Sequence, residues 1–136
     1  MTQPTAAKWA TVKRAAVLGA GAIGASWTAW LLARGLSVTV WDPRPEAEGY
    51  VRRYVADAWP AMSRPGMMPD ASPDAWRFVT TPEDAVAEAE FVQENVSERL
   101  AVRRELYARI DAALPEHALL PPLLELGAKA KGDATR

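Results

Sequence analysis

A glycine-rich turn between a predicted strand and a predicted helix constrains this chain more than any other stretch of its sequence. The turn has the pattern G-x-G-x-x-G and consists of Gly19, Ala20, Gly21, Ala22, Ile23 and Gly24. An apolar run, residues 15–18, leads into it, and a helical pattern, residues 26–34, follows it. In this setting the pattern is typical of dinucleotide binding, because the helix that begins at the turn directs unpaired N–H groups at a pyrophosphate.

Each glycine of the pattern has its own steric reason. Gly19 permits the tight turn off the strand, Gly21 lets a pyrophosphate approach the backbone, and Gly24 lets the helix pack closely on the strand. The alternative is a structural turn in another kind of α/β protein. A P-loop in its usual form is excluded, since no Lys-Ser or Lys-Thr pair follows the last glycine.

An acidic residue stands where the same pattern requires one. Asp42 ends the β-branched segment 36–41, close to the spacing of about 20 residues expected after the glycines. A carboxylate there accepts hydrogen bonds from the adenosine ribose and repels a 2′-phosphate, which favours NAD over NADP. Arg44 complicates this interpretation, because an arginine after the second strand can accommodate a 2′-phosphate. The alternative for Asp42-Pro43 is a simple turn at the exit of the strand.

Strand and helix patterns alternate along the chain. Apolar or β-branched segments predict strands over residues 12–18, 36–41, 76–80, 90–94 and 118–120. Periodic apolar positions and capping signals predict helices over 22–33, 45–61, 82–89 and 97–114. This order predicts a parallel sheet with right-handed crossovers, an α/β fold of the Rossmann-type, doubly wound class. We expect a single domain over 12–120, between a lead-in over 1–11 and a divergent tail over 121–136.

Composition and charge exclude several classes of function. The chain carries 16 basic and 17 acidic residues, so its charge does not favour nucleic acid or an anionic membrane as a partner. No apolar run approaches the ~20 residues of a membrane span, and residues 1–8 lack the apolar core of a signal peptide. The absence of cysteine excludes thiolate metal sites and is compatible with a reducing compartment. We therefore expect a cytoplasmic protein.

Few residues qualify for chemistry beyond cofactor binding. His117 is the only histidine, which excludes a multi-histidine metal site, and its place before the last predicted strand favours a solvated turn residue over a general base. Glu94, Asn95 and Glu98 lie at the carboxyl end of the fourth predicted strand and the start of the next helix, at the rim of the ligand crevice, where helix capping and ligand binding both stay open. Taken alone, Arg103 belongs to a solvated helix face. We therefore assign no catalytic residue and no metal ligand.

Three longer motifs occur in order along the chain: Val17–Trp27, Val40–Pro43 and Phe91–Leu100. A fourth, Asp57-Ala58-Trp59-Pro60-Ala61, precedes a proline-rich stretch. Together these motifs resemble the 3-hydroxyacyl-CoA dehydrogenase family, and in particular its L-carnitine dehydrogenase branch. The resemblance covers about residues 12–120.

The resemblance implies that NAD is held by the turn from Gly19 to Gly24 and by Asp42. It also implies cofactor contacts from Glu98 and from Arg103, a position at which the family commonly has lysine. The family oxidises a 3-hydroxy group to a ketone, and its serine-rich loop, catalytic histidine and dimerising helical domain come later in the chain. Here Pro121-Pro122-Leu123-Leu124 stand in place of that loop.

Because the resemblance stops where the catalytic groups would begin, we predict NAD binding without dehydrogenase activity for this chain alone. The break after Leu120 fits a truncated or frame-altered fragment, or an end made by cloning, and the sequence does not decide among them. The expected partners are NAD and either a second copy of the chain or a missing C-terminal domain. Two alternatives stay open: a non-catalytic nucleotide-binding or interaction module, and a fragment that needs a partner chain.

Overall fold

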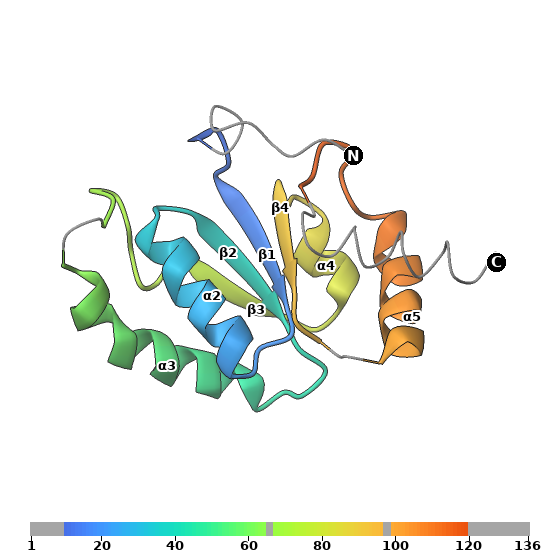
Figure 1. Ribbon diagram of the computed structural model, residues 1–136, viewed down its shortest axis with the longest axis horizontal. Coiled ribbons are helices and arrows are strands. Elements are labelled where there is room, and N and C mark those ends of the chain that lie inside the picture. Colours follow the sequence, from blue (N-terminus) through green and yellow to red (C-terminus); the bar gives the residue numbers. More distant parts are fainter. Residues whose placement is uncertain (1–9, 65–66, 97–98, 120–136) are drawn as a thin grey trace.

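The structure, a computed structural model, describes residues 10–64, 67–96 and 99–119. Its centre is a sheet of four parallel strands in the order β3-β2-β1-β4 (Figure 1). The strands are β1 (Arg14–Leu18), β2 (Ser37–Trp41), β3 (Trp76–Val79) and β4 (Phe91–Glu94). Because β4 pairs with β1 on the side opposite β2, the strand order reverses at β1, and open α/β sheets bind ligands at the carboxyl end of such a point.

Helices cover both faces of this sheet. Within the described ranges, α2 (Ala22–Ala33) and α3 (Ala47–Met62) pack on one face, and α4 (Pro82–Val86) and α5 (Leu100–Asp111) pack on the other (Figure 1). Side chains alternate along β1, so Val17 enters the first apolar cluster and Leu18 enters the second. The result is the Rossmann-type, doubly wound fold that the sequence predicts.

The predicted strands and helices agree with the structure apart from their ends, with one exception: of the strand predicted over residues 118–120, the described part forms only an isolated bridge at Leu119. The predicted start of α5 at residue 97 is wrong: the helix begins at Leu100, because Arg99 has an extended backbone with φ −71° and ψ 123°. Both α4 and α5 also end before their predicted last residues. Leu119, in the fifth predicted strand, forms a parallel bridge to Phe91 on the outer edge of β4.

The described residues do not include either end of the chain. Residues 1–9, which make up most of the predicted lead-in, and residues 120–136, which include the predicted tail, lie outside the described residues. Among the helices that the structure does describe, none is both long and apolar enough to cross a membrane.

Candidate dinucleotide-binding site

The glycine turn packs directly against the end of β4. Gly19 has a positive φ of 95°, a backbone conformation that side chains rarely accept. A Cβ at this position would lie 2.9 Å from the carbonyl carbon of Asn95 and 2.9 Å from the nitrogen of Val96. The Gly19 N–H donates to the Trp41 carbonyl (2.7 Å), and the Asn95 N–H donates to the Leu18 carbonyl (2.7 Å). Gly19 therefore joins the ends of β1, β2 and β4 at the point where the strand order reverses.

The other two glycines of the turn differ in their surroundings. A Cβ on Gly24 would overlap the carbonyl of Gly19. The first helical turn of α2 can therefore lie this close to Gly19 only because Gly24 has no side chain. A Cβ on Gly21 would meet nothing nearer than Nη2 of Arg44, at 4.0 Å. Helix α2 begins beside this open space with no side-chain cap and no acidic residue in its first turn. This combination fits a pyrophosphate, which requires close approach and a helix N-terminus without negative side chains.

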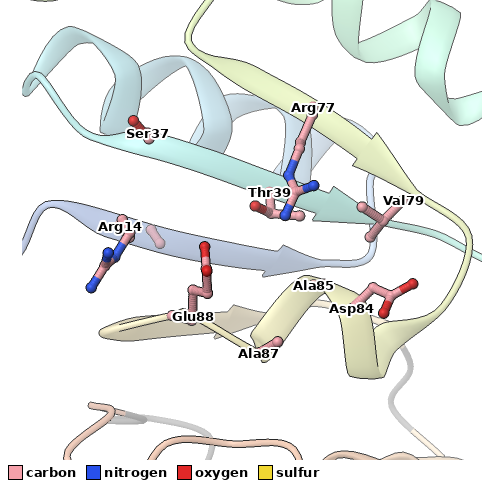
Figure 2. Close-up of a pocket in the computed structure, with 11 residues that line it drawn as sticks. Arg14, Ser37, Thr39, Arg77, Val79, Asp84, Ala85, Ala87 and Glu88 are labelled. Carbon is pink, nitrogen blue, oxygen red and sulfur yellow. The ribbon is translucent and has the colours of Figure 1, made fainter.

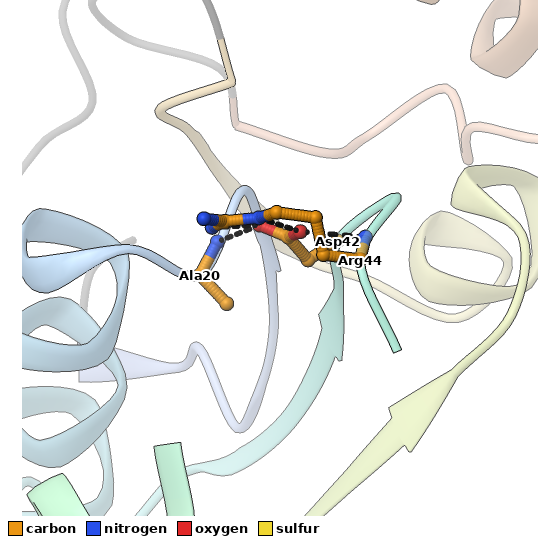
Figure 3. A network of polar contacts seen from close by, with 3 residues as sticks. All are labelled: Ala20, Asp42 and Arg44. Carbon is orange, nitrogen blue, oxygen red and sulfur yellow. Dashed lines mark hydrogen bonds and ion pairs between the residues drawn. The ribbon is translucent and has the colours of Figure 1, made fainter. Parts of the chain in front are cut away.

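Asp42 reaches from the end of β2 into the glycine turn (Figure 3). The residue is only 6% exposed. Its Oδ2 accepts hydrogen bonds from the backbone N–H of Ala20 (2.8 Å) and from Nη2 of Arg44 (3.1 Å). Its Oδ1 accepts hydrogen bonds from the backbone N–H of Arg44 (2.8 Å) and from Nε of the same residue (2.9 Å). The acid that the sequence predicts to bind a ribose thus lies beside the turn predicted to bind a pyrophosphate.

The surroundings of Asp42 keep its carboxyl group ionised. Burial raises the pKa of Asp42, but hydrogen bonds from the Arg44 side chain and from the backbone N–H groups of Ala20 and Arg44 outweigh burial and hold the pKa below its ordinary value. The hydrogen bond to Asp42 also raises the pKa of the Arg44 guanidinium. The site therefore presents a carboxylate, the form that accepts hydrogen bonds from ribose hydroxyls.

Glu94, at the end of β4, connects the rim of the sheet to α5. Its Oε1 accepts the backbone N–H of Val96 (2.6 Å), and its Oε2 lies 3.6 Å from Nε of Arg103. Arg103 is therefore directed at the rim, and the solvated helix face expected for it from the residues alone is wrong. Burial, together with the charge of Glu94, raises the pKa of nearby Tyr107 to about 12. Glu98, the other predicted cofactor contact, lies outside the described residues.

Two amide side chains at the end of β4 leave hydrogen-bonding groups unused. Nε2 of Gln93 donates to Oδ1 of Asn95 (3.1 Å), while Oε1 of Gln93 and Nδ2 of Asn95 are buried without a hydrogen-bond partner among the residues that the structure describes. Buried polar groups are nearly always paired in folded proteins. Sequence reasoning missed Gln93, although a glutamine inside an apolar strand was a signal for it.

His117 lies at the opposite end of the strands from the glycine turn. Leu119, two residues after it, donates its N–H to the Glu90 carbonyl (2.8 Å), and Oε1 of Glu90 accepts the backbone N–H groups of Lys13 (2.9 Å) and Arg14 (3.0 Å) at the start of β1. The glycine turn follows the other end of that strand. In the described part of the chain, no group of three or more histidine, aspartate or glutamate residues could hold a metal ion.

A separate hollow of about 760 Å³ lies on the face of the sheet that carries α4. Figure 2 shows Arg14, Thr39 and Arg77 on three neighbouring strands, with Glu88 extending toward them from the segment after α4. Polar and apolar side chains both line the hollow, and alternation along β2 directs Ser37 and Thr39 to this face and valines to the other. Neither the glycine turn nor Asp42 lines it, so it is distinct from the candidate site.

Four features together define an α/β dinucleotide-binding domain. They are a parallel sheet, a glycine turn at the point where the strand order reverses, a helix N-terminus without a side-chain cap, and a neighbouring carboxylate. Residues 14–121 match the model of the NAD-binding domain of 3-hydroxyacyl-CoA dehydrogenase. The chain belongs to the 3-hydroxyacyl-CoA dehydrogenase family, and the matched part is its NAD-binding domain. The resemblance and the cofactor that the sequence predicts are thereby confirmed.

L-carnitine dehydrogenases are among the similar proteins. The chain is 52% identical to the L-carnitine dehydrogenase of Streptomyces coelicolor over 104 residues, which is 76% of the chain and 33% of that enzyme. It is 46% identical to the enzyme of Pseudomonas putida over 109 residues, 80% of the chain and 34% of that protein. The chain thus spans about a third of the length of these curated relatives.

Solved structures of dehydrogenases share the fold. One is the FHMPC 5-dehydrogenase, an NAD⁺-dependent dismutase, with a TM-score of 0.71 and 26% identity over 81% of this chain and 36% of that chain. Another is the 3-hydroxybutyryl-CoA dehydrogenase of Escherichia coli K12, with a TM-score of 0.69 and 27% identity over 81% of this chain and 24% of that chain.

Proposed function

We propose that this chain is the cofactor-binding part of an NAD-dependent dehydrogenase that oxidises a 3-hydroxy group to a ketone. The turn from Gly19 to Gly24 holds the pyrophosphate at the start of α2, and Asp42 binds the adenosine ribose. Glu98 and Arg103 add further cofactor contacts. The observation that carries this proposal is the open space at Gly21, between the uncapped start of α2 and the carboxylate of Asp42. The proposed domain extends over residues 12–120, between the 1–11 lead-in and the 121–136 tail.

L-carnitine or a 3-hydroxyacyl-CoA is the proposed substrate of the whole enzyme. The similarity to L-carnitine dehydrogenases supports the first, and the family supports the second. We propose that this chain alone binds NAD without oxidising either compound, because hydride transfer requires a positioned base. The observation in favour is the place of His117, two residues before Leu119, whose N–H donates to the Glu90 carbonyl (2.8 Å) at the far end of the strands.

The exposed apolar side chains of the described residues support a partner for this domain. Ile23 is 66% exposed and Trp30 is 49% exposed on α2, and Leu100 is 47% exposed at the start of α5. We propose that these side chains pack against the remainder of the dehydrogenase or a second copy of the chain in the cytoplasm, and that the domain binds neither nucleic acid nor membrane. The near-balance of 16 basic and 17 acidic residues supports the last point.

A titration with NADH tests the cofactor site. Binding is measured by energy transfer from tryptophan to the reduced nicotinamide, for the wild-type chain and for Asp42→Asn. The amide of this variant keeps one acceptor oxygen but loses the charge, so we expect NADH to bind at least about tenfold more weakly. Asp57→Asn, an exposed change on α3, is the matched control and should bind as the wild type does. Equal affinity of the two variants would contradict the ribose assignment, and NADH formation from L-carnitine would contradict the absence of activity.

A further inference from the structure

Gln93 and Asn95, the amide pair at the end of β4, lie on the side of the sheet that carries α2. Side chains alternate along a strand, so Gln93 shares a face with Phe91, which packs in the same apolar cluster as α2. Asn95 comes two residues later, and its carbonyl carbon lies 2.9 Å from the position of a Cβ on Gly19. The amide pair therefore adjoins the glycine turn, at the carboxyl ends of β1 and β4.

The amide pair has one nitrogen and one oxygen left to offer. Nε2 of Gln93 donates to Oδ1 of Asn95, and within the described residues Oε1 of Gln93 and Nδ2 of Asn95 have no partner. If both amides rotate by half a turn, one nitrogen and one oxygen of the pair still stay unpaired. Gln93 is only 8% exposed, so bulk water does not take the place of a partner. Such groups destabilise the free chain, and a ligand that pairs with both removes that cost.

The strand order places the amide pair on the nicotinamide side of the proposed cofactor site. Asp42, the proposed ribose ligand, follows β2, and the glycine turn follows β1. Strand β4 pairs with β1 on the side opposite β2. A dinucleotide with its adenosine at β2 and its pyrophosphate at the turn therefore extends its other half toward β4. The nicotinamide ring of that half carries a carboxamide, whose carbonyl oxygen and amino group complement the free nitrogen and the free oxygen of the amide pair.

We propose that the amide pair binds the carboxamide of the nicotinamide ring: Nδ2 of Asn95 donates to its carbonyl oxygen, and Oε1 of Gln93 accepts its N–H. Asn95 lies just beyond the last residue of β4 and is only partly buried, so its side chain can turn toward a ligand while the sheet keeps its pairing. This inference rests on the proposed cofactor site, and it adds the residues that recognise the nicotinamide end of the dinucleotide.

The test measures three dissociation constants by titration calorimetry: those of NADH, of reduced 3-acetylpyridine adenine dinucleotide and of ADP-ribose. The acetylpyridine analogue keeps the carbonyl group but lacks the amino group, and ADP-ribose lacks the ring and is the control ligand. We expect the wild-type chain to bind NADH about tenfold more tightly than the analogue, the effect of one hydrogen bond to a buried acceptor. Gln93→Met keeps the length of the side chain and should bind NADH as weakly as the analogue, with the affinity for ADP-ribose unchanged.

The outcomes separate this inference from the proposed function. Equal affinities of the wild-type chain for NADH and the analogue would overturn the carboxamide contact, as would a parallel loss of NADH and ADP-ribose affinity in Gln93→Met. Either result leaves NAD binding standing. No binding of NADH or ADP-ribose by the wild-type chain would overturn the proposed function and this inference with it. Thermal unfolding identifies a variant that does not fold, and the comparison of NADH with the analogue on the wild-type chain then decides the question.

Discussion

Gly19 is a residue of the turn at which both the backbone conformation and the neighbouring backbone exclude a side chain. Its φ of 95° is unfavourable for any residue with a Cβ, and that Cβ would lie 2.9 Å from backbone atoms of Asn95 and Val96. The conformation alone costs about 1–2 kcal/mol, and the contact with backbone adds to it because backbone cannot move aside. We therefore expect Gly19→Ala to lower the free energy of unfolding by more than about 2 kcal/mol, measured by urea denaturation.

Gly21 provides the matched comparison within the same turn. Its φ of −76° suits alanine, and an added Cβ would meet only Arg44 Nη2 at 4.0 Å. Gly21→Ala should therefore unfold at the same urea concentration as the wild type, or slightly higher. Its NADH affinity should fall, because the methyl group would occupy the space in which we propose that the pyrophosphate binds. Similar losses of stability in both variants would show that the two glycines do not have separate roles.

At the scale of strands and helices, the sequence was sufficient to predict those elements whose structure depends on a local pattern. The valines of β2 alternate with polar residues, and Thr81-Pro82 begins α4 as the capping signal predicts. The start of α5 was predicted wrongly, because Ser97 satisfies the capping pattern while the backbone of Arg99 is still extended. A capping pattern indicates which residues can begin a helix, but it does not fix which one does.

The candidate site likewise has one part that could be predicted from the sequence and another that could not. The spacing from the glycines to Asp42 is a property of the sequence, and so it could be predicted. The hydrogen bonds between the side chains of Arg44 and Asp42 depend on the rotamers of these two residues. The ion pair of Arg103 with Glu94 depends on how α5 packs relative to β4. These distances are set by tertiary packing, to which a local pattern gives no access.

The cap of α4 provides a test at this scale. Oγ1 of Thr81 accepts the backbone N–H of Asp84 (3.1 Å), and α4 has only five residues, so one cap satisfies a large share of its free donors. We expect Thr81→Ala to lower the free energy of unfolding by about 1 kcal/mol. Thr80→Ala, the exposed neighbour outside the helix, should change it by less than about 0.5 kcal/mol. Equal effects on urea denaturation would contradict the role of the cap.

In the molecule as a whole, carboxylates from neighbouring segments hold both ends of the central strand β1. Asp42, after β2, accepts the N–H of Ala20 beyond the carboxyl end of β1. Glu90, just before β4, accepts the N–H groups of Lys13 and Arg14 at its amino end. The first contact belongs to the proposed nucleotide site, and the second lies at the other end of the strand. Glu90 therefore reports on the fold without disturbing cofactor binding.

The contact at Glu90 predicts how the stability of the fold depends on pH. The hydrogen bond from the Lys13 N–H, with that from Arg14, holds the pKa of Glu90 below its ordinary value despite burial. A lowered pKa means that the folded chain binds this proton less readily than the unfolded chain, whose glutamate titrates near pH ~4.3. The contribution of Glu90 is therefore complete above that pH and is lost as the pH falls through the lower pKa of the folded state.

Glu90→Gln should remove this contribution. At pH 7 we expect the variant to be less stable than the wild type by about 1 kcal/mol, since a neutral amide oxygen accepts the two N–H groups more weakly than a carboxylate does. The difference should shrink steadily as the pH falls below ~4.3, because the wild-type carboxylate is then protonated as well. Urea denaturation from pH 7 to pH 3 measures it, with the exposed Glu88→Gln as the matched control. A difference that stays constant over this range would show that the charge of Glu90 does not hold the end of β1.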